Sequence, residues 1–315
     1  MLDLDGIGEL PPALHAPLRA CASGDVPVNI AVMRLLMECR EPNDAERAIA
    51  GLLEQVSAEA GTMEVRRLQA ALDLLRSNPH AWKTVRTVLD DVRHDEAAGD
   101  PDQAIRRWAE AFDRAAHGSP EASVALYALG NPELLKAATA EVVERLRDWG
   151  LLGRERRVLD VGCGIGRFGE ALAQDVGSFV GIDISGAMVE AARRRCAAFN
   201  NVSFEQSSGR DLSLFEDGAF DLVLAVDSFP YLVQAGMPLA ETHVAEAARV
   251  LAPGGDLVIL NFSYRGDAGL DRTDVRRLAR ASGFEVLRDG ARAFSLWDGL
   301  AYHLAKVAEL RARGT

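Results

Sequence analysis

The most informative stretch of the sequence is Arg157-Val-Leu-Asp-Val-Gly-Cys-Gly-Ile-Gly-Arg-Phe-Gly-Glu-Ala-Leu-Ala173. Its apolar start predicts a strand and its end predicts a helix, with Gly162, Gly164 and Gly166 between them. Glycines at such a junction allow a tight turn and let a ligand approach the backbone. The exposed amides at the start of a helix favour an anionic or strongly polar group. The stretch therefore predicts a ligand-binding turn at the end of a strand.

A carboxylate lies about twenty residues further along the chain. Val180-Gly-Ile-Asp-Ile-Ser185 places Asp183 at the end of the second expected strand, where its carboxylate suits the two hydroxyls of a ribose. The two segments together predict an adenosine-containing cofactor at the carboxyl edge of a parallel sheet. Because Gly164-Ile-Gly-Arg-Phe-Gly169 also satisfies the G-x-G-x-x-G pattern, NAD is an alternative at this point.

Three further features bear on the choice of cofactor. Asp160 lies inside the first strand, two residues before the first glycine, where its carboxylate could reach an amino group. Phe220-Asp-Leu-Val-Leu-Ala-Val-Asp227 predicts a fourth strand with an acidic start. Arg249-Val-Leu-Ala-Pro-Gly-Gly-Asp-Leu-Val-Ile-Leu260 predicts the end of a helix, a turn and a fifth strand.

These segments, in this order and spacing, resemble the class I S-adenosylmethionine-dependent methyltransferases over about residues 155–308. The resemblance implies an α/β fold with a Rossmann-like, seven-stranded, mostly parallel sheet, an antiparallel last strand and helices on both faces. It also implies S-adenosylmethionine as the cofactor and S-adenosylhomocysteine as the product. By position, the three glycines would line the methionine part and Asp160 would contact its amino end. Asp183 would hold the ribose hydroxyls, with Ile184 beside the adenine.

One position departs from the family pattern. Many members carry an acidic residue after the third strand that binds the adenine amino group. Here that position falls on about Ser208, in Ser207-Ser-Gly-Arg-Asp-Leu212, and the nearest carboxylate is Asp211. Either the loop brings Asp211 to the adenine, or Ser208 and a backbone carbonyl make the contact.

Chemistry in this family is an in-line displacement at a sulfonium, so positioning and exclusion of water matter more than a strong catalyst. A base is needed only if the acceptor must lose a proton. Acceptor contacts are expected after the fourth and fifth strands and in the last connection. The candidate catalytic residues there are Asp227, Tyr231 and Tyr264. The candidate acceptor-binding residues are Phe229, Asn261, Arg265, Arg292 and Trp297.

These residues also have structural interpretations. Asp227 could cap nearby backbone, and the two tyrosines could form a wall rather than supply a base. The aromatic residues at these positions suit a desolvated pocket for a small organic acceptor. Arg265 and Arg292 favour an anionic acceptor if either lines that pocket. The alternative is that they form surface ion pairs with Asp267 and Asp289.

The first half of the chain has a different pattern of apolar residues. Apolar residues recur at three- and four-residue spacing from about Pro11 to Gly150, which predicts helices. Proline follows a capping residue at 100–101, 119–120 and 131–132, as expected in a first helical turn. Short β-branched runs that alternate with helical segments begin at about residue 156. We therefore expect an all-α N-terminal domain over 1–150 and an S-adenosylmethionine-binding domain over 151–315.

Composition excludes several classes of protein. The 315 residues carry a net charge of −12, which argues against a nucleic-acid partner. No apolar run approaches the roughly 18 to 20 residues that span a bilayer. The acidic start does not have the pattern of a signal peptide, so we expect a cytoplasmic protein without a membrane partner. The four cysteines and six histidines have spacings that predict neither a metal site nor a disulfide framework.

The leading hypothesis is a methyltransferase that acts on O or N of a small metabolite in an aromatic-lined pocket. The helical domain would then form a lid, or the surface of a homodimer. A second hypothesis is a protein or peptide methyltransferase whose helical domain docks the substrate, with Met33, Leu36, Met37 and Trp82 as part of a groove. A third is an NAD-binding oxidoreductase or a cofactor binder without catalysis.

Overall fold

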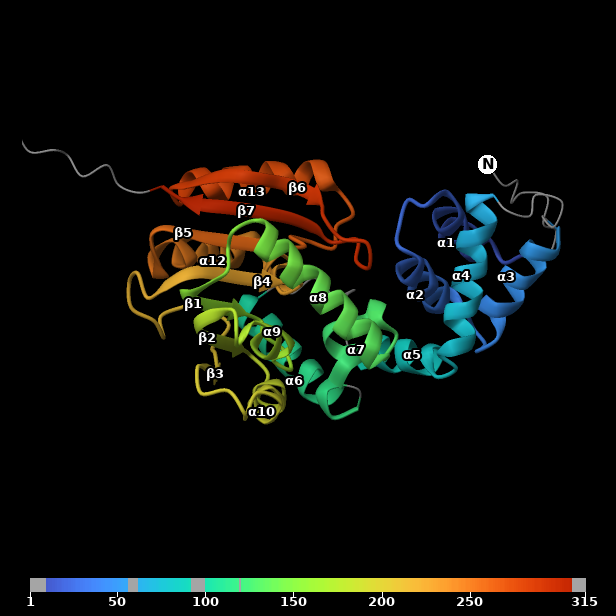
Figure 1. Ribbon diagram of the computed structural model, residues 1–315, viewed down its shortest axis with the longest axis horizontal. Helices are drawn as coiled ribbons and strands as arrows, with labels where there is room; N and C mark the ends of the chain where they lie inside the picture. Colours follow the sequence, from blue (N-terminus) through green and yellow to red (C-terminus); the bar gives the residue numbers. More distant parts are fainter. Residues whose placement is uncertain (1–9, 56–61, 92–99, 119, 308–315) are drawn as a thin grey trace, which may run out of the picture. The chain divides into compact units, whose positions relative to one another are not determined.

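The computed structural model describes residues 10–55, 62–91, 100–118 and 120–307 (Figure 1). These residues form two compact units. The helical unit contains the described parts of Met1–Arg93 with Gly118–Glu141 and Phe294–Asp298, and the sheet unit contains the described parts of His94–His117, Val142–Ala293 and Gly299–Thr315. This division differs from the boundary expected at residue 150. Nearly all of helix α6, Pro101–Gly118, groups with the sheet, and residues 294–298 group with the helices.

The sheet unit is built on a seven-stranded sheet within the described residues. Its strands are β1 Gly153–Val161, β2 Val176–Asp183, β3 Val202–Gln206, β4 Phe220–Val226, β5 Leu251–Leu260, β6 Phe284–Arg292 and β7 Leu300–Lys306. Their order is β3-β2-β1-β4-β5-β7-β6, and β7 runs antiparallel to both of its neighbours. The predicted Rossmann-like topology with an antiparallel last strand is therefore confirmed.

Helices cover both faces of this sheet (Figure 1). Residues 222–226 of β4 are all buried, as expected for a central strand that is covered on both sides. On one face, Val223 and Ile259 share a core with Val244 of α12, Met237–Val250, and Leu278 of α13, Ala268–Ala281. On the other face, helix α9, Arg167–Leu172, packs its Gly169 against aromatic rings of β2 and β3. The expectation of helices on both faces is confirmed.

The helical unit contains α1 Pro12–Ser23, α2 Val28–Glu38, α3 Asp44–Gln55, α4 Met63–Ser77, α5 Ala81–Asp91, α7 Pro120–Val124, the 3-10 turn η2 Leu126–Ala128 and the first part of α8 Pro132–Asp148. Its core includes Leu18, Ile30 and Leu68. Helix α7 and the turn η2 are two short pieces, and Leu129 has a positive φ of 58° after the second. Leu36 is buried, and the Trp82 Nε1 donates to the Cys39 carbonyl.

The segment between β6 and β7 belongs to this helical unit. Ser295 donates to the Glu141 carboxylate through both its amide and its hydroxyl, each at 2.6 Å. Asn29 donates from Nδ2 to the Leu296 carbonyl at 2.7 Å. Trp297 is buried and stacks on Tyr127, with ring centroids 5.9 Å apart. Side-chain contacts with the helices therefore hold a loop whose two flanking strands lie in the sheet unit.

Across the described parts of the chain, no helix combines the length and apolar character required to cross a membrane.

Candidate functional site

The glycine turn after β1 has the backbone that its sequence predicts. Gly162, Gly164 and Gly166 have φ values of 77°, 52° and 75°, in the left-handed region that side chains rarely adopt. The amides of Gly162 and Cys163 both donate to the Ile182 carbonyl of β2, at 2.8 and 2.9 Å. A Cβ on Gly162 would also clash with the Cβ of Ser228, which follows β4. Glycine is thus required at residue 162 by both conformation and space.

Asp183 connects this turn to the next helix. Its Oδ2 accepts from the Gly164 amide at 2.9 Å, and its Oδ1 accepts from the Ser185 amide at 2.9 Å. Burial raises the pKa of this carboxyl, and its bonds to backbone amides oppose the rise. The bonds fix the carboxylate at the carboxyl end of β2, before helix α10, Gly186–Arg195. A ribose could use its remaining acceptor capacity.

Asp160 lies at the end of β1 and is only 1% exposed. Neither of its carboxylate oxygens has a hydrogen-bond partner among the described residues. Burial raises the pKa of Asp160 to about 7, although the Arg167 guanidinium favours the ionised form, while Asp183 adds to the rise. A buried carboxylate without hydrogen bonds is costly unless a ligand compensates it. The environment of Asp160 fits a ligand with a cationic group, such as an amino end.

The loop after β3 contains the residues expected near an adenine. Gly209 has a φ of 71°, and a Cβ there would lie 2.7 Å from Ile184 Cγ2 and 3.1 Å from Ile105 Cγ2. Ser208 Oγ accepts from the Arg210 amide, and Asp211 Oδ1 accepts from the amide and hydroxyl of Ser213. Both predicted adenine contacts therefore stabilise their own loop, and an adenine contact by either stays a prediction.

A polar group lies at the ends of β4 and β5. Asp227 and Asn261 both have positive φ, at 58° and 69°, a conformation that is uncommon for residues other than glycine. Asp227 Oδ1 accepts from Asn261 Nδ2 at 2.8 Å and from the Tyr264 hydroxyl at 3.0 Å. The structure thus brings together three residues that sequence reasoning selected separately.

Aromatic rings surround this polar group. The Tyr231 ring makes edge contacts with Tyr264, Trp108 and Phe112, at centroid distances of 5.8, 5.0 and 5.1 Å. Trp108 and Phe112 come from α6. Burial, with a further contribution from the Asp227 carboxylate, raises the pKa of Tyr231 above the ordinary value for a phenol. Tyr264, by contrast, is 42% exposed. A phenol is protonated near neutral pH, and the catalytic role expected for each tyrosine stays a prediction.

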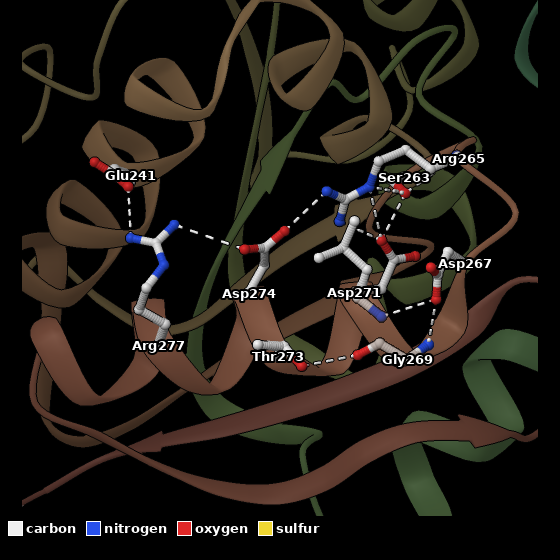
Figure 2. Close-up of polar contacts among 10 residues, drawn as sticks. Glu241, Ser263, Arg265, Asp267, Gly269, Asp271, Thr273, Asp274 and Arg277 are labelled. Carbon is white, nitrogen blue, oxygen red and sulfur yellow. Dashed lines mark hydrogen bonds and ion pairs between the residues drawn. The ribbon is translucent and has the colours of Figure 1, made fainter.

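Other predicted acceptor contacts have different surroundings. Phe229 is buried in the core and stacks on Phe262, with ring centroids 5.7 Å apart. Figure 2 shows Arg265 turned toward α13, where its guanidinium pairs with Asp271 at 2.5 Å and Asp274 at 2.8 Å. The surface partner considered for it, Asp267, instead caps α13 by accepting from the Gly269 and Leu270 amides. Acceptor binding by Phe229 and Arg265 thus stays a prediction, as it does for Arg292 and Trp297.

Sequence reasoning missed the part that α6 has in this site. The helix was assigned to a separate domain, yet Trp108 and Phe112 pack on Tyr231. Its Asp102 also forms a two-bond ion pair with Arg210 of the loop after β3, at 2.7 and 2.8 Å. The two aromatic residues are four apart, which places them on one face of a helix. That spacing was the available signal, but it does not say which surface the face contacts.

Comparison with known proteins bears on the same region. Residues 158–255 match a protein family described as "Methyltransferase domain". Over this segment the chain is similar to methyltransferase domains. The matched segment includes the glycine turn, Asp183 and Asp227, and α6 lies outside it.

Curated relatives similar to this segment are named as methyltransferases of small molecules. The demethylmenaquinone methyltransferase of Tropheryma whipplei (strain Twist) is 38% identical over 107 residues, which are 34% of this chain and 42% of that protein. The chloroplastic tocopherol O-methyltransferase of Arabidopsis thaliana is 34% identical over 170 residues, which are 50% of this chain and 46% of that protein. The chain thus spans less than half the length of these relatives.

A solved structure shares the fold over much of the chain. It is phosphoethanolamine N-methyltransferase 1 of Haemonchus contortus, in complex with phosphoethanolamine and S-adenosylhomocysteine. The TM-score is 0.52 at 17% sequence identity, and the match covers 71% of this chain and 53% of that chain. At this identity the likeness concerns the fold alone.

The glycine turn predicts a difference between two matched substitutions. Gly162 and Gly254 both have a φ of 77°, but a Cβ on Gly254 would meet nothing within 4 Å. Gly254→Ala should therefore cost about 1–2 kcal/mol in unfolding free energy, from backbone strain alone. Gly162→Ala should cost at least about 1–3 kcal/mol more, because it adds the clash with Ser228. Equal losses in urea unfolding would contradict this explanation of the turn.

The surroundings of Asp160 predict a pH-dependent effect on stability. Its pKa is raised to about 7 in the folded chain, so the folded state binds more protons than the unfolded state between pH 4 and 7. Its contribution to stability therefore falls as the pH rises through that window. The unfolding free energy of Asp160→Asn, relative to that of the unmodified protein, should therefore be higher at pH 8 than at pH 5, by on the order of 2 kcal/mol. The same effect of the substitution at both pH values would refute the buried-carboxylate assignment.

Proposed function

We propose that the chain is an S-adenosylmethionine-dependent methyltransferase that methylates an oxygen or nitrogen of a small aromatic acceptor. When bound, the cofactor supplies an electrophilic methyl group on a sulfonium. Asp160 would hold its amino end, Asp183 its ribose hydroxyls, and the glycine turn its methionine part. Ile184 would lie beside the adenine. Each of these residues belongs to the sheet unit and lies at or next to the carboxyl ends of β1 and β2.

The buried Asp160 carboxylate is the observation that carries this proposal. It lacks hydrogen-bond partners among the described residues, and it lies within electrostatic reach of Asp183. The amino group and sulfonium of S-adenosylmethionine are cationic and would compensate this negative charge. The pyrophosphate of NAD would instead add negative charge beside two buried carboxyl groups. These electrostatics support S-adenosylmethionine over the dinucleotide.

The aromatic cluster supports an aromatic acceptor. Four aromatic rings contact one another in this cluster, those of Trp108, Phe112, Tyr231 and Tyr264. Tyr264 also donates to the Asp227 carboxylate. Rings of this kind pack well against a flat apolar body, while the carboxylate can accept a hydrogen bond from a hydroxyl or amino group. The relatives named for demethylmenaquinone and tocopherol support a small-molecule acceptor in the same way.

The geometry also suggests how a proton would move. An acceptor hydroxyl that hydrogen-bonds to Asp227 would pass its proton to that carboxylate as its oxygen becomes methylated. Asn261 and Tyr264 both donate to Asp227 Oδ1, so they hold the carboxylate in place. Tyr231 would complete the wall as a protonated ring. The neighbouring donors therefore position Asp227.

The function can be tested with two substitutions at this polar group. Asp227→Asn keeps the size of the side chain and a residue type that tolerates positive φ, but it removes the proton acceptor. It should lower kcat for a phenolic acceptor by about 10²–10⁴-fold, with little change in the Kd for S-adenosylhomocysteine. Tyr264→Phe keeps the ring and removes one donor, so its effect on kcat should be smaller.

The measurement is methyl transfer from radiolabelled S-adenosylmethionine to a panel of phenols, hydroquinones and anilines. Cyclohexanol and cyclohexylamine serve as non-aromatic controls. Turnover of the non-aromatic controls at equal efficiency would contradict the aromatic-acceptor proposal. Full activity of Asp227→Asn on a phenol would remove Asp227 from the proton-transfer role.

A further inference from the structure

Helix α6 makes a second contact with the cofactor-binding edge, separate from its aromatic packing. Asp113 Oδ1 accepts from the Ser185 hydroxyl at 2.5 Å and from the Ala187 amide at 3.0 Å. Ser185 is fully buried at the start of α10, where its Oγ also accepts from the Met188 amide at 3.1 Å. A carboxylate from a helix about 70 residues earlier in the chain therefore completes the cap of α10.

The same turn holds Asp183. The Ser185 amide donates to Asp183 Oδ1, and Asp183 Oδ2 accepts from Gly164 of the glycine turn. Ser185 therefore donates hydrogen bonds to both acids, and it connects Asp113 to the Asp183 carboxylate that would bind ribose. The Ser185 hydroxyl points its proton to Asp113, while its amide points to Asp183. Movement of the Asp113 contact would shift the turn that orients Asp183.

We propose that Asp113 is a positioning residue for the ribose of the cofactor, acting through Ser185 on Asp183. The proposal rests on the proposed function only in taking the ligand to be S-adenosylmethionine or its product. Asp113 touches neither the ligand nor the reacting atoms in this scheme. It holds the turn over 183–187 in the conformation in which the Asp183 carboxylate faces two hydroxyls.

The contact between Asp113 and Ser185 lies next to the aromatic cluster in sequence. Phe112, the neighbour of Asp113 in α6, packs on Tyr231 in the aromatic cluster. One helix therefore contacts both the ribose-binding turn and the proposed acceptor wall. The helix lies outside the segment that matches the methyltransferase family.

The experiment measures calorimetric Kd values for two probes, S-adenosylhomocysteine and its analogue that lacks both ribose hydroxyls. The readout is the ratio of the analogue Kd to the S-adenosylhomocysteine Kd. Asp113→Ala should reduce this ratio about tenfold, since a misplaced Asp183 loses its preference for the hydroxyls. Asp113→Asn should stay within about threefold of the unmodified protein, because its amide oxygen can still accept from Ser185 and Ala187.

Two further variants sharpen the outcome. Asp102→Ala removes the ion pair with Arg210 in the loop after β3, so any loss of affinity should be the same for both probes and the ratio should stay unchanged. Asp113→Glu keeps the charge but displaces it by one methylene, so it should lower the ratio even if Asp113→Ala does not fold. A ratio that stays at the unmodified value in both Asp113→Ala and Asp113→Glu would overturn the proposal. An equal loss of affinity for both probes would also overturn it, since that result indicates a general structural role.

This readout separates two failures. If the unmodified protein binds S-adenosylhomocysteine and discriminates against the analogue, the proposed cofactor stands whatever the Asp113 variants do. If the unmodified protein binds neither probe, the proposed function fails first, and the positioning role of Asp113 fails with it.

Discussion

Two acidic side chains, Asp160 and Asp183, are buried at the carboxyl ends of β1 and β2. Their different hydrogen bonding is the constraint on which the proposed site depends. Asp183 accepts hydrogen bonds from the glycine turn and from the start of α10, so it joins two elements of the proposed cofactor site. Asp160 accepts none from the described residues and is almost fully buried. Burial without compensation is unfavourable for a carboxylate. Asp183 therefore has a structural contribution of its own, whereas the proposed role of Asp160 is to bind a ligand.

Helix α6 lies outside the matched segment and contacts the sheet unit at several points. It brings Trp108 and Phe112 to Tyr231, Asp102 to Arg210, and Asp113 to the start of α10. These contacts reach both the proposed acceptor site and the loops beside the proposed cofactor. One helix therefore contacts both proposed sites, and the strand-end residues Asp227 and Asn261 form a hydrogen-bonded pair beside it.

The sequence predicted the features that depend on local pattern. The strand after residue 156, the glycine turn and Asp183 were recognisable because spacing along the chain determines strand ends and tight turns. The contacts of α6 were not, since an amphipathic helix shows which side is apolar but not what it packs against. Arg265 likewise shows that the sequence does not determine which nearby carboxylate an arginine pairs with. Asp267 is used by the helix cap, so the guanidinium pairs with Asp271 and Asp274 one and two turns into α13.

Proton-linked calorimetry of S-adenosylhomocysteine binding tests the central claim, that Asp160 is a buried carboxyl group prepared for a cationic ligand. Titrations at pH 7 in buffers of different ionisation enthalpy measure the protons released. A group with a pKa of about 7 is half protonated there, so binding should release up to about half a proton, and Asp160→Asn should abolish the release. Binding without proton release, an unchanged release in Asp160→Asn, or binding of NADH in place of S-adenosylhomocysteine would contradict the account.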